Sequence, residues 1–261
     1  MNLDLQGKVA WIGGASKGLG RACAESLAAE GAKVILTARN QGDLDEAVNA
    51  LRKKGCEAVG IVADLGSPKA VESTISNALV AFGGIDIAVI NSGGPKVGKF
   101  MDLSSLDWQE GYYRTLGYVT DVCRIIIPSM VDNKWGRIIT ITSIVATEPA
   151  STLALSSVFR VGVLNLVKLL SQDFARENIT VNNISPGAFK TDRAIQLMQD
   201  RSARTGETLS HIENEIIKNL PMGRYQVPEE CGAVAAFLAS KRASGITGMD
   251  IRVDGGISKS I

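Results

Sequence analysis

Short runs of β-branched residues alternate with longer amphipathic segments along the whole chain. The apolar runs predict seven strands, at residues 8–13, 33–38, 58–62, 85–90, 137–142, 179–184 and 250–253. Helical spacing of apolar positions between them predicts helices that include residues 18–30, 43–54, 68–82, 153–177 and 228–239. Because such alternation produces right-handed βαβ crossovers, we expect a doubly wound α/β fold with one parallel sheet.

One region interrupts this alternation. Residues 188–227 replace a short connection with two polar helical segments. A long insertion after a late strand lies at the carboxyl edge of a doubly wound sheet, where ligands bind. We therefore predict a substrate lid at residues 188–227, with a solvated surface excursion as the alternative. No linker or repeat divides residues 1–261, so we expect a single domain.

Charge and cysteine content exclude several classes of partner. The chain has 28 basic and 27 acidic residues and no long Lys/Arg run, which argues against nucleic acid. Cys23, Cys56, Cys123 and Cys231 are widely separated and His211 is the single histidine, so we expect no metal site. With no signal pattern and no apolar stretch near twenty residues, we expect a cytoplasmic protein outside the membrane.

A glycine-rich turn follows the first predicted strand and opens the first predicted helix. Glycines in this context allow a tight turn and let the backbone approach a pyrophosphate, which then meets the positive end of the helix. Strand, turn and helix in this order support a dinucleotide site. The candidate cofactor-binding residues of the turn are Gly14, Ser16, Lys17, Gly18, Leu19 and Gly20.

The end of the second predicted strand indicates which dinucleotide fits. An acidic residue there binds the ribose 2′-OH, whereas a basic residue accepts a 2′-phosphate. This chain has Ala38 followed by Arg39, and Lys17 lies inside the glycine turn. Two cations would flank a 2′-phosphate, so NADP(H) is favoured over NAD(H). The alternative is that Arg39 stacks on adenine while Lys17 is solvated.

Several motifs together resemble the short-chain dehydrogenase/reductase family over essentially the full length. GGASKGLG at residues 13–20 is similar to the family's TGxxxGxG turn, with Gly13 replacing Thr. NSGG at residues 91–94, the PG pair at 186–187 with Thr191, and DGG at 254–256 are similar to further motifs. The resemblance is strongest to β-ketoacyl-carrier-protein-reductase-like members. It implies a seven-stranded Rossmann sheet, a small-molecule substrate and usually a tetramer.

The same resemblance assigns further site residues. Ser143, in ITS at the end of the fifth strand, corresponds to the family's catalytic serine. The resemblance implies additional cofactor contacts by Asp64, Leu65, Asn91, Gly93, Pro186, Gly187 and Thr191.

The residues that carry the family's chemistry depart from its pattern. The YxxxK motif should begin thirteen residues after Ser143, and this register places Ser156 at Tyr and Arg160 at Lys. Thr115 stands where the family has Asn. Together with the C-terminal GISKSI, this segment is similar to a tyrosine-deficient subgroup that includes an enone reductase of the bacilysin pathway.

These substitutions change the expected mechanism. Ser156 is too weak an acid to protonate an alkoxide, and Arg160 can hold the nicotinamide ribose and negative charge but not shuttle a proton. We therefore expect reduction of a conjugated enone, with Ser143, Ser156 and Arg160 stabilising an enolate. Carbonyl reduction with water as the acid is a second enzymatic alternative. An NADP(H)-binding protein without turnover, as a redox sensor or partner subunit, is the competing class.

Three further expectations concern alternatives and partners. A displaced acid could come from Tyr112, Tyr113 or Tyr118, although helix-borne tyrosines more often pack. The lid cations suggest an anionic substrate if they point inward, and a solvated charged face otherwise; they are Lys190, Arg193, Arg201 and Arg204. Segments 112–130 and 153–177 are too apolar for one-sided burial, so we expect a homotetramer, with a homodimer as the alternative.

Overall fold

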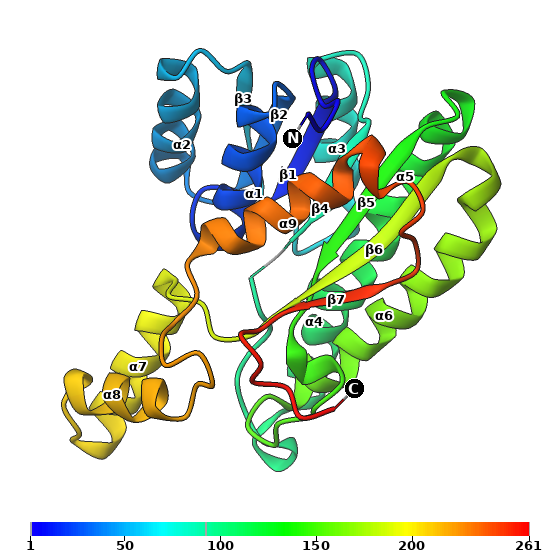
Figure 1. Ribbon diagram of the computed structural model, residues 1–261. Coiled ribbons are helices and arrows are strands. Elements are labelled where there is room, and N and C mark those ends of the chain that lie inside the picture. Colours follow the sequence, from blue (N-terminus) through cyan, green and yellow to red (C-terminus); the bar gives the residue numbers. More distant parts are fainter. Residues whose placement is uncertain (1, 92, 261) are drawn as a thin grey trace.

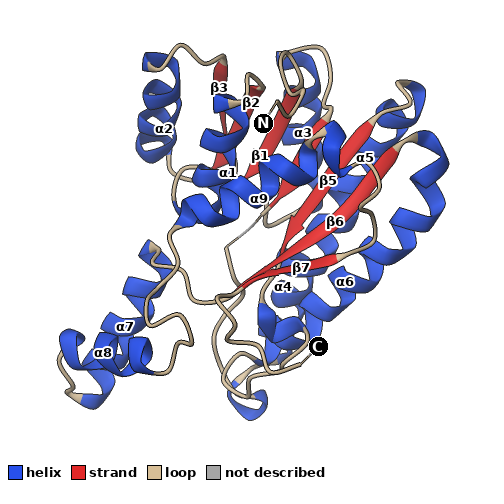
Figure 2. Cartoon of the chain, viewed as in Figure 1, coloured by secondary structure: helices blue, strands red, loops and turns tan. Residues whose placement is uncertain are grey.

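The computed structural model describes residues 2–91 and 93–260. Its centre is a seven-stranded parallel sheet in the order β3-β2-β1-β4-β5-β6-β7 (Figures 1 and 2). The strands are β1 (Val9–Gly13), β2 (Lys33–Ala38), β3 (Ala58–Val62), β4 (Ile87–Ile90), β5 (Gly136–Ile141), β6 (Ile179–Pro186) and β7 (Asp250–Val253). The predicted single-domain doubly wound fold is confirmed.

Helices cover both faces of this sheet. On one face α1 (Gly18–Ala29), α2 (Gln41–Lys53) and α9 (Pro228–Ala239) contribute to one apolar core. On the other face α3 (Pro68–Ala81), α5 (Tyr118–Asp132) and α6 (Ala154–Phe174) contribute to a second core. The strand order reverses between β1 and β4, and the carboxyl ends of these strands are where such a sheet binds ligands.

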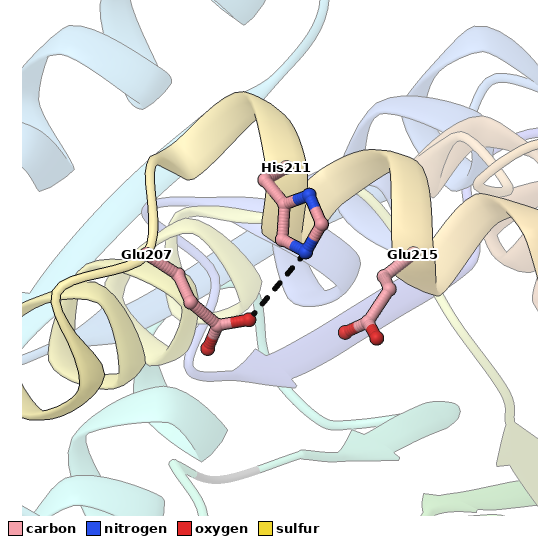
Figure 3. A group of neighbouring side chains, drawn as sticks. All are labelled: Glu207, His211 and Glu215. Carbon is pink, nitrogen blue, oxygen red and sulfur yellow. Dashed lines mark ion pairs between the residues drawn. The ribbon is translucent and has the colours of Figure 1, made fainter.

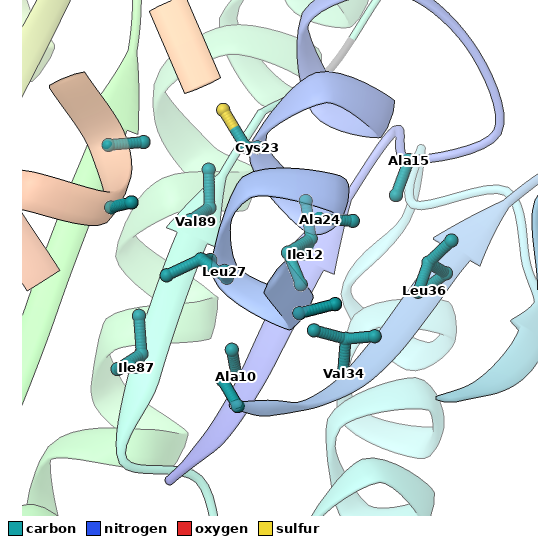
Figure 4. Close-up of a cluster of buried hydrophobic side chains, with 14 of the residues drawn as sticks. Ala10, Ile12, Ala15, Cys23, Ala24, Leu27, Val34, Leu36, Ile87 and Val89 are labelled. Atoms are coloured by element: carbon teal, nitrogen blue, oxygen red, sulfur yellow. The ribbon is translucent and has the colours of Figure 1, made fainter. Parts of the chain in front are cut away.

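Fully buried aliphatic side chains fix the first core. Ala10 and Ile12 of β1 meet Val34 of β2 and Leu27 of α1 (Figure 4). Helices α1 and α9 approach closely, and Gly232 permits this because it has no Cβ. A Cβ there would lie only 2.6 Å from the carbonyl oxygen of Ala22. This packing holds α1, and with it the glycine turn, firmly against the sheet.

Polar residues at the helix starts explain where several helices begin. The Asn40 side chain accepts a hydrogen bond from the Asp43 amide at the start of α2. Ser67 caps α3 in the same way, and Pro68 occupies the first helical position, where no amide hydrogen is needed. These local signals agree with the predicted helices to within two residues.

The predicted boundaries differ most at β4 and β6. Strand β4 begins at Ile87 rather than residue 85, because the Asp86 side chain turns back to bind the amide of Val9. Strand β6 continues to Pro186 because it pairs with β7 as far as Val253. The longer β6 carries the PG motif to the carboxyl edge.

Two helices project from the carboxyl edge, α7 (Asp192–Thr205) and α8 (Leu209–Lys218). They lie apart from the sheet in Figure 1, below α9. A third helix, α4 (Ser105–Tyr112), leads through a π-helical turn, Tyr113–Gly117, into α5. The two helical segments expected within residues 188–227 are therefore present.

One described helix, α6, is both long and apolar. The segment Ala154–Glu177, which contains α6, has 24 residues and includes an 18-residue stretch with a mean hydropathy of 1.4, so by length and composition it could cross a membrane. Leu155, Val163 and Val167 of this helix are buried in the protein, while Val161 and Leu169 are exposed. Helix α6 is apolar on two sides. One side packs on β6, and the other side is uncovered.

Candidate functional site

Two adjoining cavities lie at the carboxyl edge of the sheet. The first, here called the Ser143 cavity, has a volume of about 740 Å³ and is also lined by Ser156 and Arg160. The second, here called the Arg39 cavity, has a volume of about 610 Å³ and is also lined by Asp64 and Leu65. Several residues line both cavities, so together they form one elongated cleft.

The structure brings nearly all predicted site residues to this cleft. Those lining the Ser143 cavity are Gly14, Lys17, Gly18, Leu19, Asn91, Gly93, Ser143, Ser156, Arg160, Pro186, Gly187 and Thr191. The Arg39 cavity adds Ser16, Arg39, Asp64 and Leu65. Gly20 lines neither, and a Cβ on it would lie 2.3 Å from the carbonyl oxygen of Gly14, so this glycine allows the turn to pack on the helix. Ser92 lies outside the described residues.

The glycine turn has the backbone conformation that its sequence predicts. Gly14 and Gly18 have φ values of 59° and 57°, a region that other residues rarely adopt. Asn91 at the end of β4 donates from Nδ2 to the carbonyl oxygens of Gly13 and Gly14, at 3.3 and 3.4 Å. Lys17, the cap residue of α1, makes no side-chain capping bond. The N-terminus of α1 can therefore receive an anion.

The space beside this turn fits a dinucleotide. A Cβ built on Gly93 or Gly94 would meet no described atom within 4 Å, so the backbone borders open space across from the turn. The cleft runs from Arg39 past the turn to Ser143. Its length, its helix N-terminus and its glycine-lined walls suit a molecule with a central pyrophosphate.

The cations expected at a 2′-phosphate differ in their surroundings. Lys17 Nζ lies 3.0 Å from Asp43 Oδ2, and this contact raises the pKa of the lysine. To bind a 2′-phosphate, Lys17 must therefore first give up its ion pair with the Asp43 carboxylate. The sequence did not reveal this ion pair. Asp64 is held by two hydrogen bonds from Arg114, at 3.0 and 3.3 Å, which lower the pKa of the carboxyl group. Arg39 borders the same cavity.

Ser156 and Arg160 form one hydrogen-bonded unit in the first turns of α6. They are four residues apart and therefore share a helix face. Arg160 donates from Nε to Ser156 Oγ at 2.9 Å and from Nη1 to the carbonyl oxygen of Ile141 at 3.1 Å. Burial lowers the pKa of Arg160 to about 10. Within the described chain no carboxylate forms an ion pair with this guanidinium, so it can stabilise negative charge on a ligand.

Ser143 lies two residues after the end of β5 and lines the same cavity as this pair. Its hydroxyl accepts a hydrogen bond from the amide of Val145 at 3.4 Å. That bond uses an acceptor site and leaves the hydroxyl hydrogen to donate. The three predicted catalytic residues thus border the same cavity, and their roles remain predictions.

The tyrosines considered as displaced acids do not line the Ser143 cavity. Tyr113 donates to Asp121 Oδ2 at 2.8 Å, and Tyr118 donates to the carbonyl oxygen of Asn91 at 3.2 Å. Burial raises the pKa of both phenols, which makes them poorer acids. The Tyr112 ring packs edge-on against Phe159. None of the three is favoured as the proton donor.

The structure also explains the departure at Gly13. A Cβ on Gly13 would lie 2.5 Å from the hydroxyl oxygen of Tyr118 and 2.6 Å from the carbonyl oxygen of Asn91. No side chain fits there while Tyr118 occupies this position. Sequence patterns alone could not pair these residues, because 105 positions separate them.

The lid cations do not act as one group. Arg193, Arg201 and Arg204 line the Ser143 cavity, whereas Lys190 binds Glu213 at 2.8 Å and does not line it. The sequence also missed the apolar part of the wall. That part is formed by Phe189, Leu197, Met198, Ile212, Ile216 and Tyr225. For the four of them that lie on α7 and α8, the periodic apolar spacing was the available signal.

Three ligand-type side chains gather on α8 and the turn before it, namely Glu207, His211 and Glu215 (Figure 3). His211 Nε2 lies 3.7 Å from Glu207 Oε1. Arg201 already binds both carboxylates, at 2.8 Å to Glu207 and 2.6 Å to Glu215. Because both carboxylates already bind the Arg201 guanidinium, we retain the expectation that no metal binds.

Comparison with known proteins agrees with this architecture. Residues 14–258 match the family described as enoyl-(acyl carrier protein) reductase. A 3-oxoacyl-(acyl-carrier-protein) reductase from Salmonella typhimurium is 33% identical over 255 residues, covering 98% of this chain and 99% of that protein.

Solved structures give the same result. L-sorbose reductase from Gluconobacter frateurii, complexed with NADPH and L-sorbose, has a TM-score of 0.95 at 30% identity and full coverage of both chains. An NADPH-dependent reductase involved in bacilysin biosynthesis has a TM-score of 0.93 at 28% identity, covering 98% of this chain and 100% of that one. With its glycine turn, its parallel sheet and these relatives, the chain belongs to the short-chain dehydrogenase/reductase family.

Proposed function

We propose that this protein is an NADP(H)-dependent oxidoreductase that reduces a conjugated enone without the family's tyrosine acid. The observation that carries the proposal is the buried Arg160, hydrogen-bonded to Ser156 and without an ion pair in the described chain. Membership of a family of hydride-transfer enzymes supports the reaction class. Relatives solved with NADPH or NADP support the cofactor.

The chain's own residues provide a place for each part of the cofactor. Arg39 would bind the 2′-phosphate. Lys17 would bind the same phosphate once its ion pair with Asp43 has broken. Asp64 and Leu65 would border the adenine. Arg160 would hold the nicotinamide ribose at the far end. When bound, NADPH supplies a hydride from the nicotinamide ring.

The site suits a reaction that produces a weakly basic anion. Hydride addition to the β-carbon of an enone moves an electron pair onto the carbonyl oxygen and gives an enolate. Arg160, Ser156 and Ser143 would donate hydrogen bonds to that oxygen. Water or the substrate would then protonate the α-carbon. Reduction of an isolated ketone gives a more basic alkoxide, for which Ser156 is a poor acid, so carbonyl reduction with water as the acid is the second enzymatic candidate.

The lid and the subunit contacts complete the proposal. Residues 188–227 would form the lid, and the apolar residues of α7 and α8 would cover the substrate. Arg204 makes no ion pair in the described chain and borders the Ser143 cavity, which supports an anionic substrate. Exposed apolar residues on α4 and α6 would form contacts in a homotetramer.

The test compares cofactor binding with turnover. NADPH affinity is measured by titration, and NADPH consumption is measured over a panel of enones, quinones and β-keto thioesters. Binding with turnover of an enone is the expected result. Turnover of β-keto thioesters but no enone would replace the proposal with carbonyl reduction. Binding without consumption of any compound would favour a sensor or a non-catalytic subunit.

A further inference from the structure

The Ser143 and Arg39 cavities share a wall at the middle of the cleft. The residues that line both are Gly14, Lys17, Asn91, Gly93, Gly94, Pro95, Lys96 and Arg193. Seven of these belong to the glycine turn or to the segment after β4. Arg193 alone comes from the lid, where it occupies the first turn of α7.

The shared wall is where the phosphates of a dinucleotide must lie. If the adenosine end occupies the Arg39 cavity and the nicotinamide end the Ser143 cavity, the pyrophosphate spans the junction. This step rests on the proposed function. The junction includes Gly14 and adjoins the N-terminus of α1, as expected for a phosphate position.

The cations of the shared wall differ in their partners. Lys17 lies 3.0 Å from Asp43, and Lys96 lies 2.9 Å from Asp107. Arg193 forms no ion pair with any residue of the described chain. A pyrophosphate carries about two negative charges, whereas a helix N-terminus supplies about half a positive charge. The helix N-terminus therefore offsets only part of this charge, and Arg193 can offset more of it.

Local structure places the start of α7, and with it Arg193, beside the glycine turn. Thr191 caps α7 by accepting a hydrogen bond from the Ala194 amide at 3.3 Å. Its methyl group lies 3.5 Å from the position that a Cβ on Gly18 would take, so the lid begins in contact with the phosphate turn. The backbone of Arg193 is therefore held near the glycine turn, and its side chain is long.

We propose that Arg193 binds the pyrophosphate of NADP(H) and thereby couples the position of the lid to cofactor binding. A guanidinium can donate two parallel hydrogen bonds to phosphate oxygens, which a lysine cannot reproduce. Cofactor binding would hold the start of α7 against the glycine turn. Residues 192–218 would then open less often above the substrate.

The test uses the full chain and its Arg193→Gln variant, with Lys218→Gln as the matched control. Lys218 lies on the other lid helix, α8, and lines neither cavity. Dissociation constants are measured for NADPH, for 2′-phospho-ADP-ribose and for adenosine 2′-monophosphate. The second probe keeps the pyrophosphate without nicotinamide, and the third lacks the pyrophosphate.

Arg193→Gln should weaken NADPH and 2′-phospho-ADP-ribose by about tenfold or more, the order expected for one charge-assisted contact. It should leave adenosine 2′-monophosphate binding within about twofold, and Lys218→Gln should leave all three unchanged. NADPH should also slow amide exchange across residues 192–218 in the unaltered protein but much less in Arg193→Gln.

Two results would overturn the inference alone. One is unchanged NADPH affinity in Arg193→Gln, and the other is equal weakening of all three probes, which would indicate a general loss of fold or charge. Failure of the unaltered protein to bind NADPH at all would instead overturn the proposed function, and the inference with it. The unaltered chain therefore separates the two failures.

Discussion

Arg160 donates a 2.9 Å hydrogen bond from Nε to Ser156 Oγ, which joins the two residues that stand in the register of the family's Tyr and Lys. Arg160 also donates to the carbonyl oxygen of Ile141 at the end of β5. These two bonds fix a buried guanidinium beside the cavity without neutralising it. The site thereby keeps a cation but has no tyrosine hydroxyl in that register.

Substitution at this pair should separate the roles of its members. Arg160→Ala should reduce turnover of the true substrate by about a hundredfold or more, the typical effect of losing one oxyanion donor. Ser156→Ala should cost less, because a neutral hydroxyl makes a weaker hydrogen bond than a charged donor. Steady-state kinetics on the substrate identified by the panel measure both effects.

Ser156→Tyr with Arg160→Lys is the matched control, and it should leave NADPH binding intact. If Arg160→Ala retains cofactor affinity and full turnover while Ser143→Ala abolishes turnover, the proposed role of Arg160 is wrong. Ser143 would then be the remaining candidate.

The pH dependence of turnover should follow Arg160. Burial lowers its pKa to about 10, so the guanidinium stays charged below that value and loses its charge as the pH rises through it. Turnover that depends on this cation should therefore be constant from about pH 6 to 9 and fall only near pH 10. A loss of turnover centred between pH 6 and 8 would indicate a different essential group.

Cofactor choice should depend on Arg39. NADPH should bind at least about tenfold more tightly than NADH, a difference near 1.4 kcal/mol. Arg39→Asp should reverse this preference, because a carboxylate binds a ribose 2′-OH and repels a 2′-phosphate. Calorimetric titration with both cofactors measures this difference. Equal affinities in the unaltered protein would refute the assignment.

Lys17 provides a second measurement on the same phosphate. Its ion pair with Asp43 must break before it can bind a 2′-phosphate. Asp43→Asn should therefore strengthen NADPH binding and leave NADH binding almost unchanged. An equal effect on both cofactors would mean that Lys17 does not reach the 2′-phosphate.

Assembly should depend on the exposed apolar side of α4 and α6. Leu106, Val161 and Leu169 on these helices are 62%, 41% and 59% exposed. Val161→Glu with Leu169→Glu should convert a tetramer to smaller species in light scattering, because it places charges in an apolar contact. The control is Val80→Glu on α3, a helix at the opposite edge of the sheet. This variant should not change the molecular mass of the assembly. A clean monomer of the unaltered protein at micromolar concentration would contradict the prediction.

Stability should depend on the space between Gly13 and Tyr118. Gly13→Ala should lower the free energy of unfolding by about 1–3 kcal/mol, the usual cost of overpacking. Tyr118→Phe should relieve only part of that cost, because a Cβ on Gly13 would also meet the Asn91 carbonyl oxygen at 2.6 Å. Urea unfolding of the two single variants and the double variant measures the coupling. Strictly additive effects would show that the two residues do not compete for space.

The sequence by itself determined the sheet, the glycine turn and the positions of Ser143, Ser156 and Arg160. Strand and helix periodicity and glycine placement are local properties, so the seven strands were predicted to within two residues. The carboxyl ends of parallel strands lie at one edge, which brought nearly all predicted site residues to one cleft. The register of α6 placed Ser156 and Arg160 on one helix face without knowledge of the fold.

Only the tertiary structure decided which partners those residues have. Lys17 binds Asp43, Lys190 binds Glu213, and Arg193 faces the junction of two cavities. The four lid cations look equivalent in sequence, but packing of α7 and α8 gives them different surroundings. Side-chain pairing between distant segments depends on the angle and separation at which helices pack. Those quantities follow from the summed contacts of the whole core, which no local pattern records.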